Sequence, residues 1–167
     1  CVLFVTIMSC KIRVAQREDM KQVLQLIQEL ATFEKKDDAV EVSVQDLEED
    51  GFGKQKLFHC FVAEKNEKIV GMALVYPRYS TWKGAVIHLE DLIVTKDMRG
   101  TGLGTALLDE VVKYGNDLGV KRICWEVIDW NEPAIGFYES KGAKVMRDWD
   151  VVQLDEAGIK NYLSAIA

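Results

Sequence analysis

In the first part of the chain, the spacing of apolar residues changes from that of a strand to that of a helix. Apolar and polar residues alternate in residues 11–15, which predicts a strand, and residues 18–35 then carry apolar side chains at helical spacing. Ser43 and Asp46, three residues apart, resemble a capping box. We therefore expect a second, short helix that starts at Ser43 and ends at Gly51.

The middle of the chain predicts three strands. Apolar runs at residues 57–65 and 68–79 flank a short polar turn at Asn66 and Glu67, which is a hairpin signal. Residues 85–95 are apolar on both faces, as is typical of a central strand. A helical period follows the glycine-rich stretch that comes next.

The C-terminal part alternates helices and strands. The helix after the glycine stretch is expected to stop at Gly119, and residues 121–128 predict a strand. Asn131 as N-cap, with Pro133 in the first turn, predicts another helix. That helix stops at a glycine, residue 142. Residues 143–154 predict a last strand, after which an aspartate, residue 155, caps a short terminal helix.

This order of elements predicts an α/β fold with a mixed, mostly antiparallel central sheet flanked by helices. The chain has 167 residues and is 49% hydrophobic, which suits a single domain over residues 1–167 with a real core. Residues 1–7 are apolar but too few to span a bilayer, and they lack a basic region. We interpret them as an upstream extension before a natural start at Met8.

The net charge and the positions of the cysteines disfavour some partners and metal sites. The formal net charge of −6 argues against nucleic acid and anionic membrane as partners, and it suits a cationic small molecule. No cysteine belongs to a CxxC pair, and neither histidine has a metal-ligand spacing to one, so no metal site is expected. We expect reduced thiols in a cytoplasmic protein. The cysteines are Cys1, Cys10, Cys60 and Cys124.

The stretch "DMRGTGLGTALLDEV" (97–111) places three glycines at alternate positions just before a helix. The first turn of a helix has unpaired N–H groups and a partial positive charge, and glycines let an anion approach them closely. Arg99 adds a cation that can contact phosphate. The stretch therefore indicates a phosphate-binding loop.

Several interpretations of this loop compete. A Walker loop would need GxxxxGK[ST], which is absent, and a dinucleotide fingerprint would need a glycine where Thr105 stands, after the first strand of a βαβ unit. A nicotinamide oxidoreductase is disfavoured on these grounds. The pattern Arg-x-x-Gly-x-Gly is filled by Arg99, Gly102 and Gly104. A glycine-rich turn without a ligand is the plain alternative.

The Arg-x-x-Gly-x-Gly pattern resembles the pyrophosphate-binding loop of the GCN5-related N-acetyltransferase (GNAT) family. Within that family the chain is similar to spermidine/spermine N-acetyltransferases, and most closely to their thialysine-acetylating relatives. The resemblance covers nearly the whole domain. Five separated motifs carry it: "DGFG" (50–53), "FHCFVAE" (58–64), "YSTWKG" (79–84), "HLEDLIV" (88–94) and "DWNEPAIGFY" (129–138).

The resemblance implies an acetyl-CoA-dependent N-acetyltransferase that acts on a primary amine, releases CoA and forms a homodimer. An alkylammonium must lose a proton before it can attack, and the leaving thiolate should gain one. The resemblance makes Glu90 the base, through water, and Tyr138 the acid. It gives Asp91 to substrate binding or to support of the base. Strand alternation predicts that Glu90 and Asp91 point to opposite faces.

Simpler roles remain open for these residues, because a carboxylate can pair with an arginine and Tyr138 can be a packing aromatic. The resemblance further implies that backbone N–H groups on the central strand hold the acetyl group and the pantetheine arm. The implied cofactor-binding residues are Leu92, Ile93, Val94, Arg99, Gly100, Thr101, Gly102, Leu103, Gly104, Thr105, Asn131, Pro133, Ala134 and Tyr138.

The amine pocket is expected at the end of the first helix and in the loop at "YSTWKG". Trp82 offers a face for a cation and Glu34 a countercharge, although Glu34 can equally be solvated surface. Trp125 and Trp149 are wall candidates that can equally be core residues. The implied substrate-binding residues are Phe33, Glu34, Trp82, Glu90, Asp91, Trp125 and Glu126.

One difference in sequence from the polyamine acetyltransferases bears on the choice of substrate. They carry an acidic residue before a Pro-Trp pair, where this chain has Ser80-Thr81-Trp82-Lys83. We therefore expect thialysine, a lysine-like amine or a short diamine rather than spermidine or spermine. The alternatives are a polyamine or protein-lysine acetyltransferase and, in a different class, an acyl-CoA sensor without catalysis. Retention of Glu90 and Tyr138 argues against the sensor.

Overall fold

The computed structural model describes residues 10–166, and these fall into two compact units that are divided after Glu126. The first unit contains a five-stranded sheet in the order β1-β2-β3-β4-β5. The strands are β1 (Lys11–Val14), β2 (His59–Lys65), β3 (Lys68–Ser80), β4 (Gly84–Val94) and β5 (Ile123–Cys124). Neighbours from β1 to β4 are antiparallel and β5 runs parallel to β4, which confirms the mixed, mostly antiparallel sheet.

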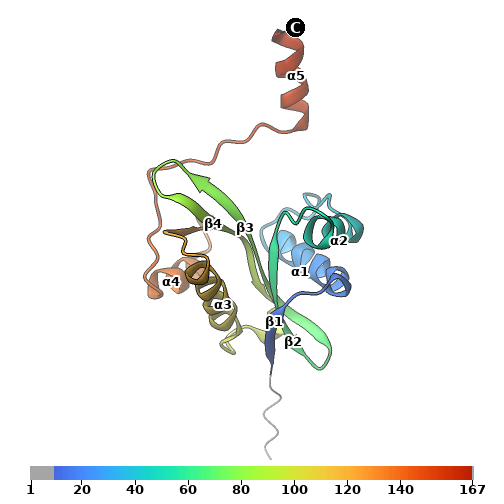
Figure 1. Cartoon of the computed structure of the whole chain (residues 1–167), viewed down its shortest axis with the longest axis vertical. Coiled ribbons are helices and arrows are strands. Elements are labelled where there is room, and N and C mark those ends of the chain that lie inside the picture. Colours follow the sequence, from blue (N-terminus) through green and yellow to red (C-terminus); the bar gives the residue numbers. More distant parts are fainter. Residues whose placement is uncertain (1–9, 167) are drawn as a thin grey trace, which may run out of the picture. The chain divides into compact units, whose positions relative to one another are not determined.

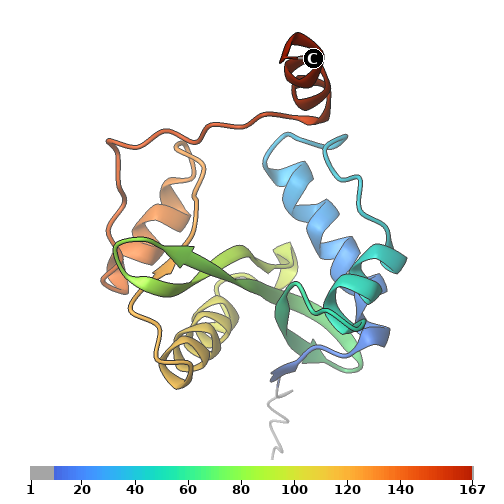
Figure 2. The same ribbon diagram turned by 45° about the horizontal axis from the view of Figure 1, so that its top comes forward.

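Helices cover both faces of this sheet. Figures 1 and 2 show α1 (Met20–Phe33) and α2 (Val44–Phe52) on one face and α3 (Leu103–Asp117) on the other. Short 3-10 turns precede two of them, namely η1 (Arg17–Asp19) and η2 (Lys96–Met98). The α1 face buries Met20 of α1 and Met72 of β3 completely, and the α3 face likewise buries Leu107 of α3.

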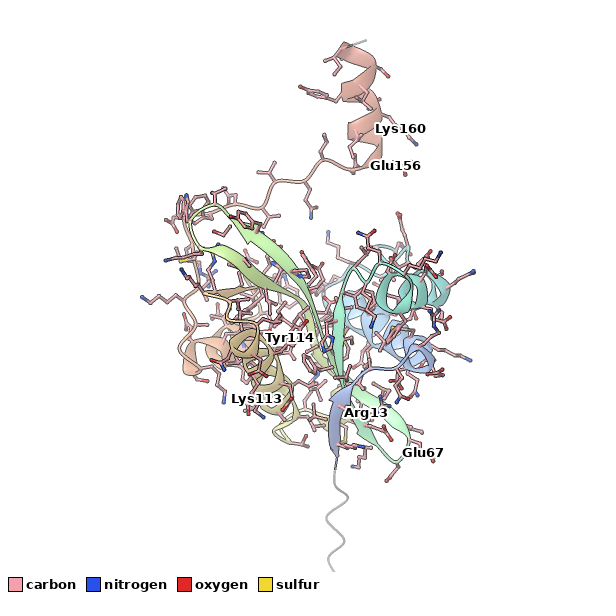
Figure 3. All side chains as sticks on the ribbon, viewed as in Figure 1. Arg13, Glu67, Lys113, Tyr114, Glu156 and Lys160 are labelled. Carbon is pink, nitrogen blue, oxygen red and sulfur yellow. The ribbon has the colours of Figure 1, made fainter. Side chains whose placement is uncertain are left out.

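A hairpin turn, a helix cap and a helix stop lie where the sequence predicts them. Asn66 and Glu67 both adopt positive φ, 51° and 62°, in the hairpin turn between β2 and β3, where Figure 3 shows Glu67 at the tip. The Ser43 hydroxyl accepts a hydrogen bond from Asp46 N at 3.1 Å, and the Asp46 carboxylate accepts one from Ser43 N at 2.8 Å. Gly119 after α3 has φ of 68°, the conformation expected of a helix stop.

The second unit contains α4 (Glu132–Ser140) and α5 (Glu156–Ile166). Asn131 caps α4, because its Oδ1 accepts a hydrogen bond from Ala134 N at 3.3 Å. Asp155 caps α5 in the same way, through Gly158 N at 2.7 Å. Both caps confirm the predicted helix starts.

Two strand predictions need correction. The strand predicted for residues 121–128 is limited to Ile123–Cys124, and residues 143–154 form no strand at all in the structure. A strand persists only where a neighbour completes its backbone hydrogen bonds, and the described part of the second unit offers no sheet edge. The apolar side chains of the segment are accordingly exposed, with Val152 at 91% and Trp149 at 66%.

The N-terminal predictions cannot be placed, because residues 1–7 and Met8 lie outside the described residues. Among residues 10–166, none of the helices combines the length and apolar character needed to cross a membrane.

Candidate active site

The glycine loop joins β4 to α3 and leaves the start of α3 open. Gly100 and Gly102 adopt left-handed conformations with φ of 73° and 88°, and Gly102 is the N-cap residue, which has no side chain to cap the helix. Outside its chain neighbours and the adjacent backbone of α3, the described atom nearest to a Cβ built at Gly104 is Val94 Cγ2, at 4.0 Å. The free N–H groups of the first turn and this open space suit a pyrophosphate group.

Arg99 is held beside this loop by three neighbours. Its Nε donates a hydrogen bond to the Val94 carbonyl at 3.0 Å, and one of its terminal nitrogens lies 3.7 Å from the Glu29 carboxylate. The guanidinium also lies over the Phe33 ring, 5.3 Å from its centroid. The predicted phosphate-binding arginine and the predicted pocket residue Phe33 are therefore in contact.

Glu29 of α1 hydrogen-bonds to the start of the loop. Its carboxylate accepts hydrogen bonds from Thr95 Oγ1 at 2.8 Å and from Lys96 N at 2.9 Å. Within the loop, Thr101 Oγ1 donates to the Met98 carbonyl at 2.6 Å. Helix α1 thus fixes the segment in which Arg99 and the glycines lie.

β4 contains a bulge at Glu90. Where β3 pairs with β4, Leu74 lies opposite Asp91 and Val75 lies opposite Leu89, so Glu90 is the extra residue. Leu74 and Val75 point to opposite faces, and Asp91 and Leu89 do so as well. Because Leu74 belongs to the buried cluster that includes α1, Asp91 lies on the α1 face.

Glu90 points to the same face as Asp91. His88 pairs with Tyr76, which is two residues beyond Leu74 on β3, and Glu90 Oε2 lies 3.6 Å from His88 Nε2. The prediction that Glu90 and Asp91 point to opposite faces is therefore wrong, because the bulge interrupts the alternation.

The three predicted carboxylates interact electrostatically. Burial, together with the negative charges of Glu90 and Glu34, raises the pKa of Asp91 to about 6. Burial also raises the pKa of Glu34, which follows directly on α1. Two half-buried carboxylates beside an exposed third one are well placed to bind an organic cation, because its charge offsets theirs.

Beyond His88, the side of β4 that faces β5 has no partner strand among the described residues. β5 pairs with β4 only at Ile87 and His88. On the other side, Leu92 and Val94 lie opposite Ala73 and Gly71 of β3. The free side of β4 is the expected position for an extended ligand arm that takes hydrogen bonds from the backbone of residues 92–94.

The hairpin tip between β3 and β4 carries the second part of the predicted amine pocket. Trp82 is 78% exposed, and its backbone N–H and that of Lys83 both lie 3.3 Å from Ser80 Oγ, which accepts from them. Trp125 is half-buried and Glu126 is exposed, directly after β5. None of these contacts tests a role in binding.

The remaining predicted residues lie on α4 of the second unit. Pro133 and Ala134 are in its first turn, and Tyr138 is buried, with its ring 5.3 Å from that of Phe137. The role of Tyr138 and the cofactor contact of Asn131 stay predictions.

Three residues near the site were not predicted from the sequence: Tyr76, His88 and Glu29. His88 stands two residues before Glu90, so strand alternation alone could have placed both on one face. Tyr76 and Glu29 approach the site from other elements, and no local spacing in the sequence indicates that.

Known proteins resemble this chain in sequence and in architecture. The profile of the Acetyltransferase (GNAT) family matches residues 20–143. The chain is 39% identical over 141 residues to thialysine N-epsilon-acetyltransferase of Bos taurus, covering 80% of this chain and 83% of that protein. It is 36% identical over 140 residues to spermidine/spermine N(1)-acetyltransferase-like protein 1 of Homo sapiens, covering 80% of this chain and 20% of that protein.

A solved structure of low identity shares the fold. An aminoglycoside N-acetyltransferase in complex with CoA superposes with a TM-score of 0.70 at 16% sequence identity, over 87% of this chain and 94% of that chain.

Proposed function

Because this chain belongs to the acetyltransferase (GNAT) family, we propose that it acetylates the primary amine of thialysine or of a similar lysine-like molecule. The protein is an enzyme that transfers an acetyl group to an amine. The observation that carries the finer proposal is that Asp91, on the face of β4 that packs against α1, interacts electrostatically with both Glu90 of β4 and Glu34 at the end of α1.

The carboxylates bind and then deprotonate the amine. Asp91 and Glu34, both with raised pKa, attract the ammonium group and are themselves stabilised in their charged form by it. Glu90 is the more exposed carboxylate, with 53% of its side chain accessible, so it can exchange protons with water and accept the amine proton directly or through one water molecule.

The loop and the free side of β4 hold the second substrate. Acetyl-CoA, which enzymes of this family use, supplies the acetyl thioester. The first-turn N–H groups of α3, with Arg99, bind its pyrophosphate, and backbone groups of residues 92–94 orient the acetyl end.

Tyr138 donates the proton that the leaving thiolate needs. This role is supported by the motif "DWNEPAIGFY" and by the position of Tyr138 on α4, the helix that Asn131 caps. Tyr138→Phe removes only the hydroxyl, so we expect turnover to fall by about 10- to 100-fold with acetyl-CoA affinity nearly unchanged. Equal turnover of the variant and the wild type in a steady-state assay would contradict this role.

Lys83 supports the choice of substrate. A long polyamine carries several positive charges, which a lysine at the rim would repel, whereas an amine with its own carboxylate can pair with that lysine. Because the chain matches thialysine N-epsilon-acetyltransferase over most of its length, thialysine is the first amine to test.

The test is acetyl-CoA consumption across a panel of thialysine, lysine, ornithine, putrescine, spermidine, spermine and a lysine-containing peptide. We expect the highest kcat/KM for thialysine. Preference for spermidine would overturn the substrate, and acetyl-CoA binding without turnover on any amine would favour a sensor.

Two further proposals follow from the same resemblance: the enzyme is a homodimer and it works in the cytoplasm. Light scattering on the purified chain, and imaging of a tagged chain in its native cell, test them.

A further inference from the structure

His88 is a buried titratable residue that the proposed reaction does not use. It is 6% exposed and lies in the middle of the sheet, between β3 and β5. Its ring lies 5.0 Å from that of Tyr76, its Nδ1 3.7 Å from Cys124 Sγ, and its Nε2 3.6 Å from Glu90 Oε2. Both ring nitrogens therefore face a group that can exchange or share a proton.

Cys124 offers a partner for one of the two ring nitrogens. Its thiol donates to the Ile87 carbonyl, with Sγ 3.6 Å from the oxygen, and in this arrangement the sulfur presents lone pairs to its other neighbours. Arg78 also donates to this sulfur, at 3.9 Å. The arrangement favours the tautomer of neutral His88 with its hydrogen on Nδ1, toward the sulfur, and with the Nε2 lone pair toward Glu90.

An imidazole lone pair and a carboxylate oxygen that face each other have room for one proton between them. Without it the two acceptors repel each other, and with it they form a charge-assisted hydrogen bond, which shortens the contact. The Tyr76 hydroxyl also interacts with Glu90, and burial and that negative charge both raise the pKa of Tyr76, so it stays a proton donor.

We propose that His88 is a positioning residue for amine acetylation, which accepts on Nε2 the proton that Glu90 takes from the substrate ammonium and then holds the Glu90 carboxylate through that proton. This rests on the proposed function, in which Glu90 is the base. The N–H bond of the ammonium breaks as an O–H bond forms on Glu90. That O–H bond then breaks as an N–H bond forms on His88, and the proton later returns through Glu90 to water.

The charged groups around His88 permit this transient charge. Glu90 on β4 stabilises the imidazolium, and Arg78 on β3, which donates to Cys124 Sγ, opposes it. Tyr76 on β3 and Cys124 on β5 are the other neighbours. The imidazolium therefore has one charged neighbour of each sign.

The first test is nitrogen NMR of the histidine rings at a fixed pH, which needs no turnover. The chain has two histidines, and His59 is the internal control because it stacks on Tyr114 of α3, which Figure 3 labels. In Glu90→Gln we expect the His88 Nε2 resonance to shift, because the carboxylate that faces it is replaced by an amide, with the His59 resonances unchanged. An unchanged His88 Nε2 resonance overturns the proposal.

The second test is the pH dependence of turnover in His88→Gln, which can hold Glu90 but cannot take up its proton. We expect kcat to fall by about tenfold near neutral pH, with the loss shrinking as the amine deprotonates at higher pH and the KM for acetyl-CoA constant. His59→Gln should keep the wild-type pH profile. His88→Phe keeps a ring against Tyr76 but can neither hydrogen-bond Glu90 nor take up its proton, so its loss should be at least as large and should show the same pH dependence.

The outcomes separate the two proposals. A loss in His88→Gln that is equal at every pH indicates a structural role and overturns the inference. Absence of amine turnover by the wild type overturns the proposed function and, with it, the role of His88 in catalysis. If His88→Phe does not fold, the NMR comparison and the pH profile of His88→Gln still test the role of His88.

Discussion

The glycine loop at residues 99–105 and the carboxylate cluster on β4 differ in how they are built. The loop is a local structure, in which left-handed glycines precede a helix with open first-turn N–H groups. The cluster is assembled from α1, β3 and β4, and it depends on one extra residue, Glu90, in the pairing of two strands. The loop should therefore govern cofactor affinity alone, whereas the cluster should govern proton transfer, amine binding and stability together.

Among the variants considered, Glu90→Gln should have the largest effect, because it removes proton transfer by the carboxylate cluster. Loss of the base should lower kcat/KM by about 100-fold or more near neutral pH, where the amine is charged. The effect should shrink as pH rises toward the amine pKa of about 10.4. Steady-state kinetics across pH measure it, with Glu67→Gln at the hairpin tip as a matched control. A pH-independent loss would refute the base role.

Asp91→Asn should stabilise the protein at the expense of amine binding. The folded pKa of about 6 lies above the ordinary value of 3.8, so ionisation is unfavourable in the folded state. The penalty is absent below about pH 4, grows up to about pH 6 and is complete above that, at about 3 kcal/mol. Urea unfolding of both proteins at several pH values checks this. Equal stabilities at all pH values would contradict the assigned burial of the charge.

Gly104→Leu should act on the loop alone. Gly104 lies in the first turn of α3 without a left-handed φ, so leucine adds bulk without backbone strain. We expect acetyl-CoA affinity to fall by roughly 30-fold, with unchanged unfolding free energy. Calorimetric titration measures the affinity, and Gly104→Ala should have a smaller effect. Unchanged affinity in the leucine variant would remove the loop from the cofactor site.

Ser80→Asp with Lys83→Asp should give the smallest change, a shift of specificity. Two carboxylates and the loss of a positive charge at the hairpin tip favour a polycation. We expect the ratio of kcat/KM for spermidine to that for thialysine to rise by about tenfold, or about 1.4 kcal/mol. A ratio that does not move would place Lys83 outside the pocket.

Much of the fold followed from patterns that are local in sequence. The capping box at Ser43 and the hairpin turn at Asn66 and Glu67 each need only neighbouring residues, and both are confirmed. The strand predicted for residues 143–154 needed a partner edge, which no local pattern can supply. The shortening of β5 to Ile123–Cys124 has the same origin.

The candidate site divides in the same way. The position of Arg99 and its glycines at the start of a helix was predictable, because the glycine spacing and the helical period meet in one stretch. The shared face of Glu90 and Asp91 was not, because a bulge depends on the pairing of β3 with β4. The support that Glu29 gives to the loop was hidden as well, since it spans 67 residues of sequence to Lys96.

Helix α1 contacts both of the proposed substrate sites. Glu29 on this helix accepts hydrogen bonds from Thr95 and Lys96 of the loop, and one turn later Phe33 lies against Arg99 and the helix leads into Glu34. Any coupling between the two proposed sites through this helix would be reciprocal: acetyl-CoA would change the affinity for the amine by the same factor by which the amine changes the affinity for acetyl-CoA.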